Sequence, residues 1–459
     1  MLLSITWLAA CTAGDDLSLS TTEGAETTNQ PATTSSAAEP AAEPTSPQAT
    51  APQTTDTQTT DDPPSTPTTI TPRVDLGVVE LVRSEFARLD GRRVGLITNQ
   101  VSMVDGRHLI DWMAEAPNVE LVRIFAAEHG VRGDAGAGEP IGDGVDDTTG
   151  VPIRSLYGTT RQPTPDMLDG IDTIVFDLQD VGTRYYTYTA TMGLAMQAAA
   201  AADVRFVVLD RPNPLGRIVE GDLRTDQQIS FISQYPTPSL HGLSAGELAL
   251  MIVGEAWLPG LSDLDLEVVA MSGWDGAPWT GTGLAWIAPS PGLQTTSSGL
   301  TYPATVWFEA TTLSYGAGTN LAFQAVGAPW LDAEAVVADL ESRGLPGVSF
   351  EVVELSPIDI VDVATDPRLE GETFPGVRLV INDPEVFVPS AAGLHMLEAI
   401  IDSAPGQTVI DRGAVFDLLA GTSDVRRQLL AGASASDITF DWADIAAEFE
   451  ARSFPYRLY

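Results

Sequence analysis

Short apolar segments, each followed by a cluster of polar residues, recur through the middle of this chain and constrain its fold more than any other feature. Four of them are predicted strands, at 93–98, 119–125, 173–176 and 205–209. Helical patterns occur at 108–114, 192–202 and 243–257. Short apolar strands that alternate with helices are typical of a mostly parallel sheet with both faces covered. We therefore expect an α/β domain.

The alternation of short apolar strands and helices becomes less regular near residues 297–301, and we place a domain boundary there. Beyond it the sequence predicts a helix at 333–343, strands at 348–353 and 377–382, a helix at 392–402 and a helical C-terminus. We therefore expect an α/β domain over 74–298 and a smaller α+β domain over 299–459.

The first 73 residues have a different character. Residues 1–10 are mostly apolar and end in small residues before Cys11, the only cysteine of the chain. This resembles a bacterial lipobox, although a chance cysteine is the alternative. Residues 12–73 are rich in Thr, Ser, Ala and Pro, which predicts a disordered tether. We expect residues 1–11 to be a lipoprotein signal peptide, and the protein to be extracytoplasmic and anchored to the cell membrane only by lipid on Cys11.

Charge and missing motifs exclude several classes of function. The formal net charge is −40 and the chain contains no Lys, so nucleic acid and anionic membrane surfaces are poor partners. No Gly-x-Gly-x-x-Gly follows the first strand and no P-loop is present, so no nucleotide cofactor is expected. His-x-x-x-His spacing is also absent, and we expect no metal.

Polar and aromatic residues follow the predicted strands. Because the carboxyl ends of parallel strands share one edge of the sheet, and ligands bind beyond that edge, we expect one cleft there. The alternative is a set of loops whose acids cap helices and pair with Arg. Two further candidates, His241 and Glu309, come from later segments. The candidates at the strand ends are Asn99, Glu128, His129, Arg132, Asp177, Gln179, Asp180, Arg184, Tyr185, Tyr186, Arg211 and Asn213.

Glu128 is the preferred proton donor among these residues. It follows the apolar residues 125–127, and apolar surroundings disfavour the charged form of a carboxylic acid, which suits a general acid near neutral pH. The alternative is a simple ion pair with Arg132. Planar polar groups beside aromatic rings fit sugar recognition. Trp274, Trp279 and Trp286 are either a further aromatic wall or local cores.

These motifs together resemble the NamZ-type exo-β-N-acetylmuramidases, which form glycoside hydrolase family 171 and were formerly called domain of unknown function 1343. The resemblance runs from about residue 74 to residue 459. The matching pieces occur in order at 95–100 (Gly-Leu-Ile-Thr-Asn-Gln), 125–133, 155–158, 175–188, 208–216, 219–221, 241–248, 289–291 and 327–330 (Gly-Ala-Pro-Trp).

The resemblance implies a Rossmann-like catalytic domain and a smaller C-terminal domain, with a cleft near their junction. It implies hydrolysis of terminal, non-reducing N-acetylmuramic acid from peptidoglycan fragments, in cell-wall turnover, with Glu128 as the catalytic acid/base. Glycosidases usually use two carboxyl groups. The candidates for the second are Asp177, Asp180 and Glu309. The lactyl carboxylate of the sugar needs a cation, for which Arg132, Arg184 and Arg211 are the candidates.

One segment departs from the family pattern. Tyr315 stands where the family tends to have an acid, and Ala317 where it tends to have Arg. The loss of this charge pair predicts altered substrate preference or reduced activity. It also leaves open a non-catalytic lipoprotein that binds muropeptides or sugars. A metal-dependent hydrolase using Glu128, His129, Asp177 and His241 is the remaining alternative.

Overall fold

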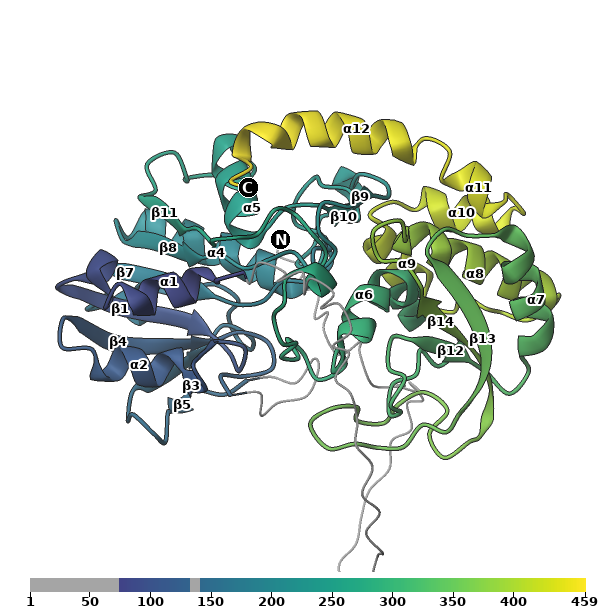
Figure 1. The fold of residues 1–459 in the computed structure, drawn as a ribbon, viewed down its shortest axis with the longest axis horizontal. Coiled ribbons are helices and arrows are strands. Elements are labelled where there is room, and N and C mark those ends of the chain that lie inside the picture. Colours follow the sequence, from purple (N-terminus) through teal and green to yellow (C-terminus); the bar gives the residue numbers. More distant parts are fainter. Residues whose placement is uncertain (1–73, 133–140) are drawn as a thin grey trace, which may run out of the picture. The chain divides into compact units, whose positions relative to one another are not determined.

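A seven-stranded sheet forms the larger of the two main sheets in the computed structural model, which describes residues 74–132 and 141–459 (Figure 1). The predictions of a signal peptide, a lipidated Cys11 and a tether lie outside the described residues. The strand order is β11-β8-β7-β1-β4-β6-β5. The strands are β1 (Arg92–Thr98), β4 (Val119–Ala126), β5 (Gly144–Val145), β6 (Pro152–Ser155), β7 (Thr173–Asp177), β8 (Arg205–Leu209) and β11 (Leu266–Val269).

The order of these strands confirms the predicted Rossmann-like fold. Every neighbouring pair is parallel except β5 and β6. In the sheet, β4 and then β6 follow on one side of β1, whereas β7, β8 and β11, which come later in the chain, follow in this order on the other side of β1. Ligands in such sheets usually bind beyond the carboxyl ends of the strands, where the order reverses. Here the reversal lies between β1 and β7.

Both faces of this sheet are buried. Ile174 and Phe176 of β7 pack in a core with residues of α3, α4 and α5, whereas Val175 packs in a second core with residues of α1 and α2. Alternate residues of a strand point to opposite faces, so the continuous apolar run serves both cores. The helices are α1 (Gly77–Arg83), α2 (Leu109–Glu115), α3 (Pro165–Leu168), α4 (Thr187–Ala201) and α5 (Ala245–Gly254).

The predicted helix boundaries differ most at α4. This helix begins at Thr187, five residues before the predicted start, because burial of its Thr and Tyr side chains outweighs their modest helix propensity. The predicted capping box of α5 is confirmed, with Ser244 and Glu247 exchanging hydrogen bonds of 3.2 and 3.0 Å. Strands β6 and β11 were not predicted, since each has only four residues and is mostly half-buried or exposed.

The C-terminal part has its own antiparallel sheet, in the order β12-β14-β13, which confirms the smaller α+β domain. Its strands are β12 (Ala325–Gly327), β13 (Val348–Leu355) and β14 (Phe374–Ile381). Its helices are α6 (Thr296–Thr305), α7 (Ala333–Arg343), α8 (Pro389–Ser403), α9 (Gly413–Ala420), α10 (Asp424–Leu430), α11 (Ala435–Ile438) and α12 (Trp442–Ser453).

Short elements complete the fold. Two hairpin-like pairs are β2 (Met103–Val104) with β3 (Arg107–His108), and β9 (Val219–Glu220) with β10 (Leu240–His241). The 3₁₀ turns are η1 (Ala87–Leu89), η2 (Asp226–Gln228), η3 (Trp279–Gly281), η4 (Val306–Ala310) and η5 (Phe454–Tyr456).

A buried carboxylate joins β9 to the C-terminal part. Glu220 accepts hydrogen bonds from the backbone N–H groups of Ser390 and Ala391, at 2.9 and 2.5 Å. These two residues lie in the first turn of α8, whose N–H groups have no partner within the helix. Burial raises the pKa of Glu220 to about 7. The Glu220 carboxylate, from the N-terminal half of the sequence, therefore provides hydrogen-bond acceptors for two N–H groups at the start of α8.

Candidate active site

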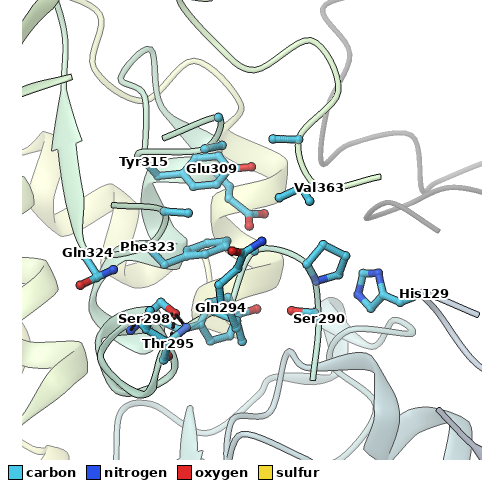
Figure 2. Close-up of a pocket in the computed structure, with 18 of the residues that line it drawn as sticks. His129, Ser290, Gln294, Thr295, Ser298, Glu309, Tyr315, Phe323, Gln324 and Val363 are labelled. Carbon is cyan, nitrogen blue, oxygen red and sulfur yellow. Dashed lines mark hydrogen bonds between the residues drawn. The ribbon is translucent and has the colours of Figure 1, made fainter. Parts of the chain in front are cut away.

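A pocket of about 440 Å³ is lined by residues from both halves of the described chain. The first half contributes the loop after β4 and the start of α4. The second contributes the segments 290–298 and 315–324 and residues of α6 and η4. Its walls combine carboxylates, hydroxyls, amides and aromatic rings (Figure 2). This mixture suits a polar ligand with apolar faces, such as a sugar.

Glu128 is held in place on this pocket by the start of α4. The residue is 7 % exposed, and its Oε2 accepts a hydrogen bond of 2.7 Å from the Thr187 hydroxyl. Thr187 is the first residue of α4, and the N-terminus of a helix favours a nearby negative charge. Glu128 is thus nearly buried and oriented at the pocket, and a general acid/base must be positioned in this way.

The backbone turns sharply immediately after Glu128. His129 has a φ of 73°, in the left-handed region that few non-glycine residues adopt, and Gly130 follows with a φ of 80°. Both Glu128 and His129 line the pocket. Such backbone strain persists where the surrounding structure enforces it, commonly at functional sites. Here the turn places the side chains of two consecutive residues, Glu128 and His129, on the same cavity.

Five aromatic rings line one region of the pocket. Tyr185 and Tyr186 both pack edge-on against Tyr302, with ring centroids 5.8 and 6.0 Å apart. Phe323 packs edge-on against Tyr302 at 4.9 Å and stacks on Tyr315 at 4.8 Å. Burial raises the pKa of the Tyr185 and Tyr186 phenols. These two phenols therefore stay neutral near pH 7 and can donate hydrogen bonds to sugar hydroxyls.

A second carboxylate of the pocket comes from the C-terminal half. Glu309 lies in η4 and is partly buried. Arg412 donates a hydrogen bond to its backbone carbonyl oxygen. Figure 2 shows the Glu309 carboxylate pointing into the pocket toward the side chain of Gln294. The pocket therefore contains two carboxyl groups, the number that most glycosidases use.

Asp177 and Arg211 are placed elsewhere, at the reversal point of the sheet. Arg211 donates to the Asp177 carboxylate through Nε at 2.6 Å and Nη2 at 3.1 Å, and Ser102 donates to the same carboxylate. The side chains of Arg211 and Asp177 are 4 % and 0 % exposed, and neither residue lines the pocket. This buried bidentate pair therefore lies close to the reversal point, the place where ligands bind in many sheets of this kind.

Three predicted amide residues hold backbone segments together and do not line the pocket. Asn99 donates to the Tyr188 hydroxyl at 2.9 Å, and Asn213 donates to the Leu243 carbonyl at 3.2 Å. Gln179 donates to the carbonyls of residues 180 and 212, at 2.7 and 2.8 Å. Each of them fixes a loop at the edge of the sheet.

The Tyr188 hydroxyl connects this framework to the pocket. It lies 2.7 Å from the Pro289 carbonyl oxygen and 3.4 Å from the carbonyl oxygen of Glu128. Pro289 immediately precedes the pocket-lining segment 290–298. Asn99 and Tyr188 therefore position two walls of the pocket without reaching into it.

The two remaining arginines are also engaged within the protein. Arg184 is buried and donates to the backbone carbonyls of Asp222, Thr237 and Leu419 at 2.9, 2.8 and 3.0 Å. Burial lowers the pKa of Arg184 to about 10. Arg132 pairs instead with Asp146 and Asp111, at 2.8 and 2.9 Å. Neither arginine lines the pocket.

Asp180 and His241 lie close together and are both buried. Asp180 Oδ2 accepts from the Gly182 N–H at 2.7 Å and lies 3.7 Å from His241 Nε2. Burial is the main cause of the raised Tyr186 pKa, and the negative charges of Glu128 and Asp180 add to it. Tyr186 therefore lies within the electrostatic reach of both carboxylates, although Asp180 does not line the pocket.

The structure thus brings together Glu128, His129, Tyr185, Tyr186 and Glu309 of the predicted candidates. Sequence reasoning missed Thr187, Tyr302, Phe323 and Gln294 as site residues. Only Thr187 carried a signal, as it lies in a polar stretch that follows a strand. The tryptophans 274, 279 and 286 do not line the pocket, and Trp279 packs edge-on against Trp286 at 5.0 Å.

The described residues contain neither a cluster of metal ligands nor a membrane-spanning helix. Within 74–132 and 141–459, no three His, Cys, Asp or Glu side chains gather as a metal site would require. The metal-dependent alternative therefore has no ligand set in that part of the chain. The helices of the same residues include none with the length and apolar character needed to cross a membrane.

Comparisons with known proteins agree with this architecture. The sequence signature described as exo-beta-N-acetylmuramidase NamZ, N-terminal, matches residues 94–297, and its C-terminal counterpart matches residues 300–459. Peptidoglycan beta-N-acetylmuramidase NamZ of Bacillus subtilis (strain 168) is 37% identical over 395 residues, covering 85% of this chain and 93% of the relative.

Two solved structures have the same fold. Both are crystal structures of DUF1343 family proteins from Bacteroides fragilis NCTC 9343. The first has a TM-score of 0.76 and 37% identity, and the second a TM-score of 0.70 and 30% identity. In each case the match covers 84% of this chain and 99% of the solved chain.

Proposed function

Because the chain belongs to the NamZ exo-β-N-acetylmuramidase family and is a glycoside hydrolase, we propose that it releases terminal, non-reducing N-acetylmuramic acid from peptidoglycan fragments. The observation that carries this proposal is the position of Glu128. Its carboxyl group is nearly buried, held by Thr187, and lines a pocket with a second carboxylate, Glu309. Most glycosidases use two carboxyl groups, so the presence of Glu128 and Glu309 on one pocket supports the proposal.

In the proposed reaction Glu128 acts as general acid and then as base. It donates its proton to the glycosidic oxygen as the bond to the anomeric carbon breaks, and the aglycone leaves as an alcohol. The sugar ring gains positive charge in this step, and the Glu309 carboxylate stabilises that charge. Water then supplies the hydroxyl at the anomeric carbon, and its proton returns to Glu128.

The aromatic rings position the sugar for this step. Tyr302 and Phe323 pack edge-on in the wall, and we expect them to offer apolar surface to a ring face. Tyr185 and Tyr186 add phenolic groups that remain protonated. Orientation of this kind lowers the barrier because the reacting atoms are already in place.

The decisive experiment is turnover of a defined disaccharide with N-acetylmuramic acid at its non-reducing end. We expect free N-acetylmuramic acid as the product, and no cleavage when the same sugar lies inside a longer chain. NMR of the first-formed anomer would give the stereochemical outcome. Binding of the disaccharide without release of any sugar would contradict the proposal and would favour a non-catalytic muropeptide-binding lipoprotein.

We further propose that the enzyme is extracytoplasmic and lipid-anchored, with domains at 74–298 and 299–459 behind the tether. The support for the anchor is the apolar segment and small residues before Cys11. In bacterial cells, Cys11→Ala should abolish incorporation of labelled fatty acid and release the protein from the membrane fraction. Retention of label in that variant would disprove the lipid assignment.

A further inference from the structure

Arg161 packs against two aromatic rings and differs from the arginines that the fold uses. Its guanidinium carbon lies 4.5 Å from the ring centroid of Tyr157 and 4.2 Å from that of Phe231, distances at which an aromatic ring attracts a cation. Arg161 is half-buried, and its Nη1 is buried with no hydrogen-bond partner within the described part of the chain. Buried donors of this kind usually have an acceptor, so a ligand would explain the arrangement. We call these three residues the arginine stack.

The sheet places the arginine stack at the same edge as the proposed acid. Strand β6 pairs with β4 in parallel, with Ser155 opposite Ala126. Tyr157 and Glu128 each lie two residues beyond this pair. The carboxyl ends of neighbouring parallel strands lie side by side, so the stack and the acid follow adjacent strand ends.

The second ring of the arginine stack connects it to the pocket lining. Phe231 directly precedes Ile232, which lines the pocket. The guanidinium of Arg161 therefore contacts a residue next to the pocket wall, although Arg161 itself is not among the described lining residues. A ligand group that extends from the pocket beyond Ile232 would meet a cation there.

The proposed substrate carries an anionic group that could extend in this way. N-acetylmuramic acid has a lactyl group at its 3-position, which is a carboxylate when no peptide is attached, whereas the bond that breaks is at the anomeric carbon. Because these positions are not adjacent on the ring, a cation for the carboxylate must lie beside Glu128 and not against it. The predicted cations are otherwise engaged: Arg132 and Arg211 pair with aspartates, and Arg184 donates to backbone carbonyls.

We propose, on the basis of the hydrolase function above, that Arg161 binds the lactyl carboxylate of the terminal N-acetylmuramic acid. A guanidinium presents paired N–H groups that match the two oxygens of a carboxylate. Packing on two rings restricts the Arg161 side chain, so less conformational entropy is lost when a ligand binds. The net charge of −40 opposes the approach of an anion, and a fixed cation beside the pocket offsets that repulsion locally. Arg161 thus determines specificity without contacting the bond that breaks.

Two chromogenic glycosides with one common aglycone test this assignment. One is the N-acetylmuramic acid glycoside, which is an anion, and the other is its neutral lactyl N-methylamide. In Arg161→Gln we expect kcat/KM for the acid to fall by about 10- to 150-fold, mainly through KM, because a charge-assisted contact is lost away from the reacting atoms. The amide should lose much less, since it carries no charge. An undiminished rate on the acid overturns the proposal, as do equal losses on the acid and the amide.

Two further variants separate this role from a structural one. Arg161→Lys keeps the charge without the planar fork, and should recover part of the ratio of acid to amide turnover. Arg452 is the matched control, because it also lies over a ring, that of Trp257 at 5.7 Å, but belongs to α12 and pairs with Glu255. Arg452→Gln should leave the ratio at the wild-type value. An equal fall of the ratio in Arg452→Gln and Arg161→Gln would contradict the assignment.

Failure of the hydrolase function and failure of this assignment give different results. Cleavage of either glycoside by the wild type supports the hydrolase function, whereas only the change in the ratio of acid to amide tests Arg161. If neither glycoside is cleaved, calorimetric titration with free N-acetylmuramic acid and its N-methylamide replaces turnover. The wild type should then bind the acid more tightly than the amide, and Arg161→Gln should lose this difference. Equal affinities in the wild type, or no binding of the acid, overturn the proposal.

Discussion

Two groups of polar side chains follow the strands of the same sheet and differ in what their polar atoms contact. In the first, at the ends of β7 and β8, Asp177 accepts hydrogen bonds from Arg211 and Ser102, and Asp210 accepts from Ser244, Gly246 and Tyr459. We call this the closed cluster. In the second, at the end of β4, Glu128 and His129 line the pocket.

The difference follows from the neighbouring strands. Arg211 follows β8, which lies next to β7, so a cation and the Asp177 carboxylate meet at adjacent strand ends. The neighbours of β4 are β1 and β6, whose ends present the polar residues Asn99 and Ser155. A charged residue at a strand end is therefore structural when the next strand supplies its partner. Glu128 instead lines an open cavity and accepts a hydrogen bond from Thr187, the first residue of α4.

The largest effect should come from Glu128→Gln. This change keeps the size of the side chain and an oxygen that can accept from Thr187, but removes the proton that the reaction needs. We expect kcat/KM to fall by about 10²–10⁴-fold with little change in thermal stability, because general acid catalysis contributes that much. Steady-state assays and thermal unfolding of the same preparation measure both quantities. Activity near the wild-type level would remove Glu128 from its assigned role.

The opposite result is expected for Asp177→Asn in the closed cluster. Removing one partner of a buried ion pair leaves Arg211 without a counter-charge, which should lower the free energy of unfolding by about 3–5 kcal/mol. Urea unfolding measures this loss. The double variant Asp177→Asn/Arg211→Gln should recover part of it, since the unpaired cation is gone. Full stability with lost activity in Asp177→Asn would instead place Asp177 in the chemistry.

Glu220 adds a third case, a buried carboxylate that accepts hydrogen bonds from two backbone N–H groups at the start of α8. Its pKa is raised from 4.5 to about 7 by burial, so the native state binds the proton more tightly than the unfolded state. The resulting stabilisation is fully present below pH 4.5 and is lost as the pH rises through 7. Between pH 4.5 and pH 8 the free energy of unfolding should therefore fall by about 2–3 kcal/mol more in the wild type than in Glu220→Gln. Urea unfolding at several pH values measures this difference. Parallel curves for the two proteins would show that Glu220 does not titrate in this range.

The smallest effect should come from Thr187→Val, which removes the hydroxyl that orients Glu128 while keeping the shape of the side chain. Hydrogen bonds to charged groups contribute about 1.5–3 kcal/mol, so we expect kcat/KM to fall by about 10- to 150-fold. Thr187→Ser retains the hydroxyl and should restore most of the activity. Equal losses in the two variants would assign the effect to packing at the start of α4.

Sequence reasoning predicted the layers of the fold well and the site only in part. The strand at 173–176 and the capping box of Ser244 and Glu247 are determined by residues next to each other in the sequence, and both predictions were confirmed. The separation of Glu128 from Asp177 was not predictable, since it depends on which strands are neighbours. The same holds for Tyr302 and Phe323, which reach the pocket from segments more than 100 residues away in the chain. No local pattern marks such residues as site residues.

The hydroxyl of Tyr188 links two walls of the pocket. A phenol has a single proton, yet two carbonyl oxygens compete for it: that of Pro289 at 2.7 Å and that of Glu128 at 3.4 Å. The shorter contact takes the proton in this structure. If the segment after Pro289 shifts outward, the proton passes to the other carbonyl and tightens the turn that carries Glu128. Opening one wall of the pocket would in that way stiffen the other, through one hydrogen atom.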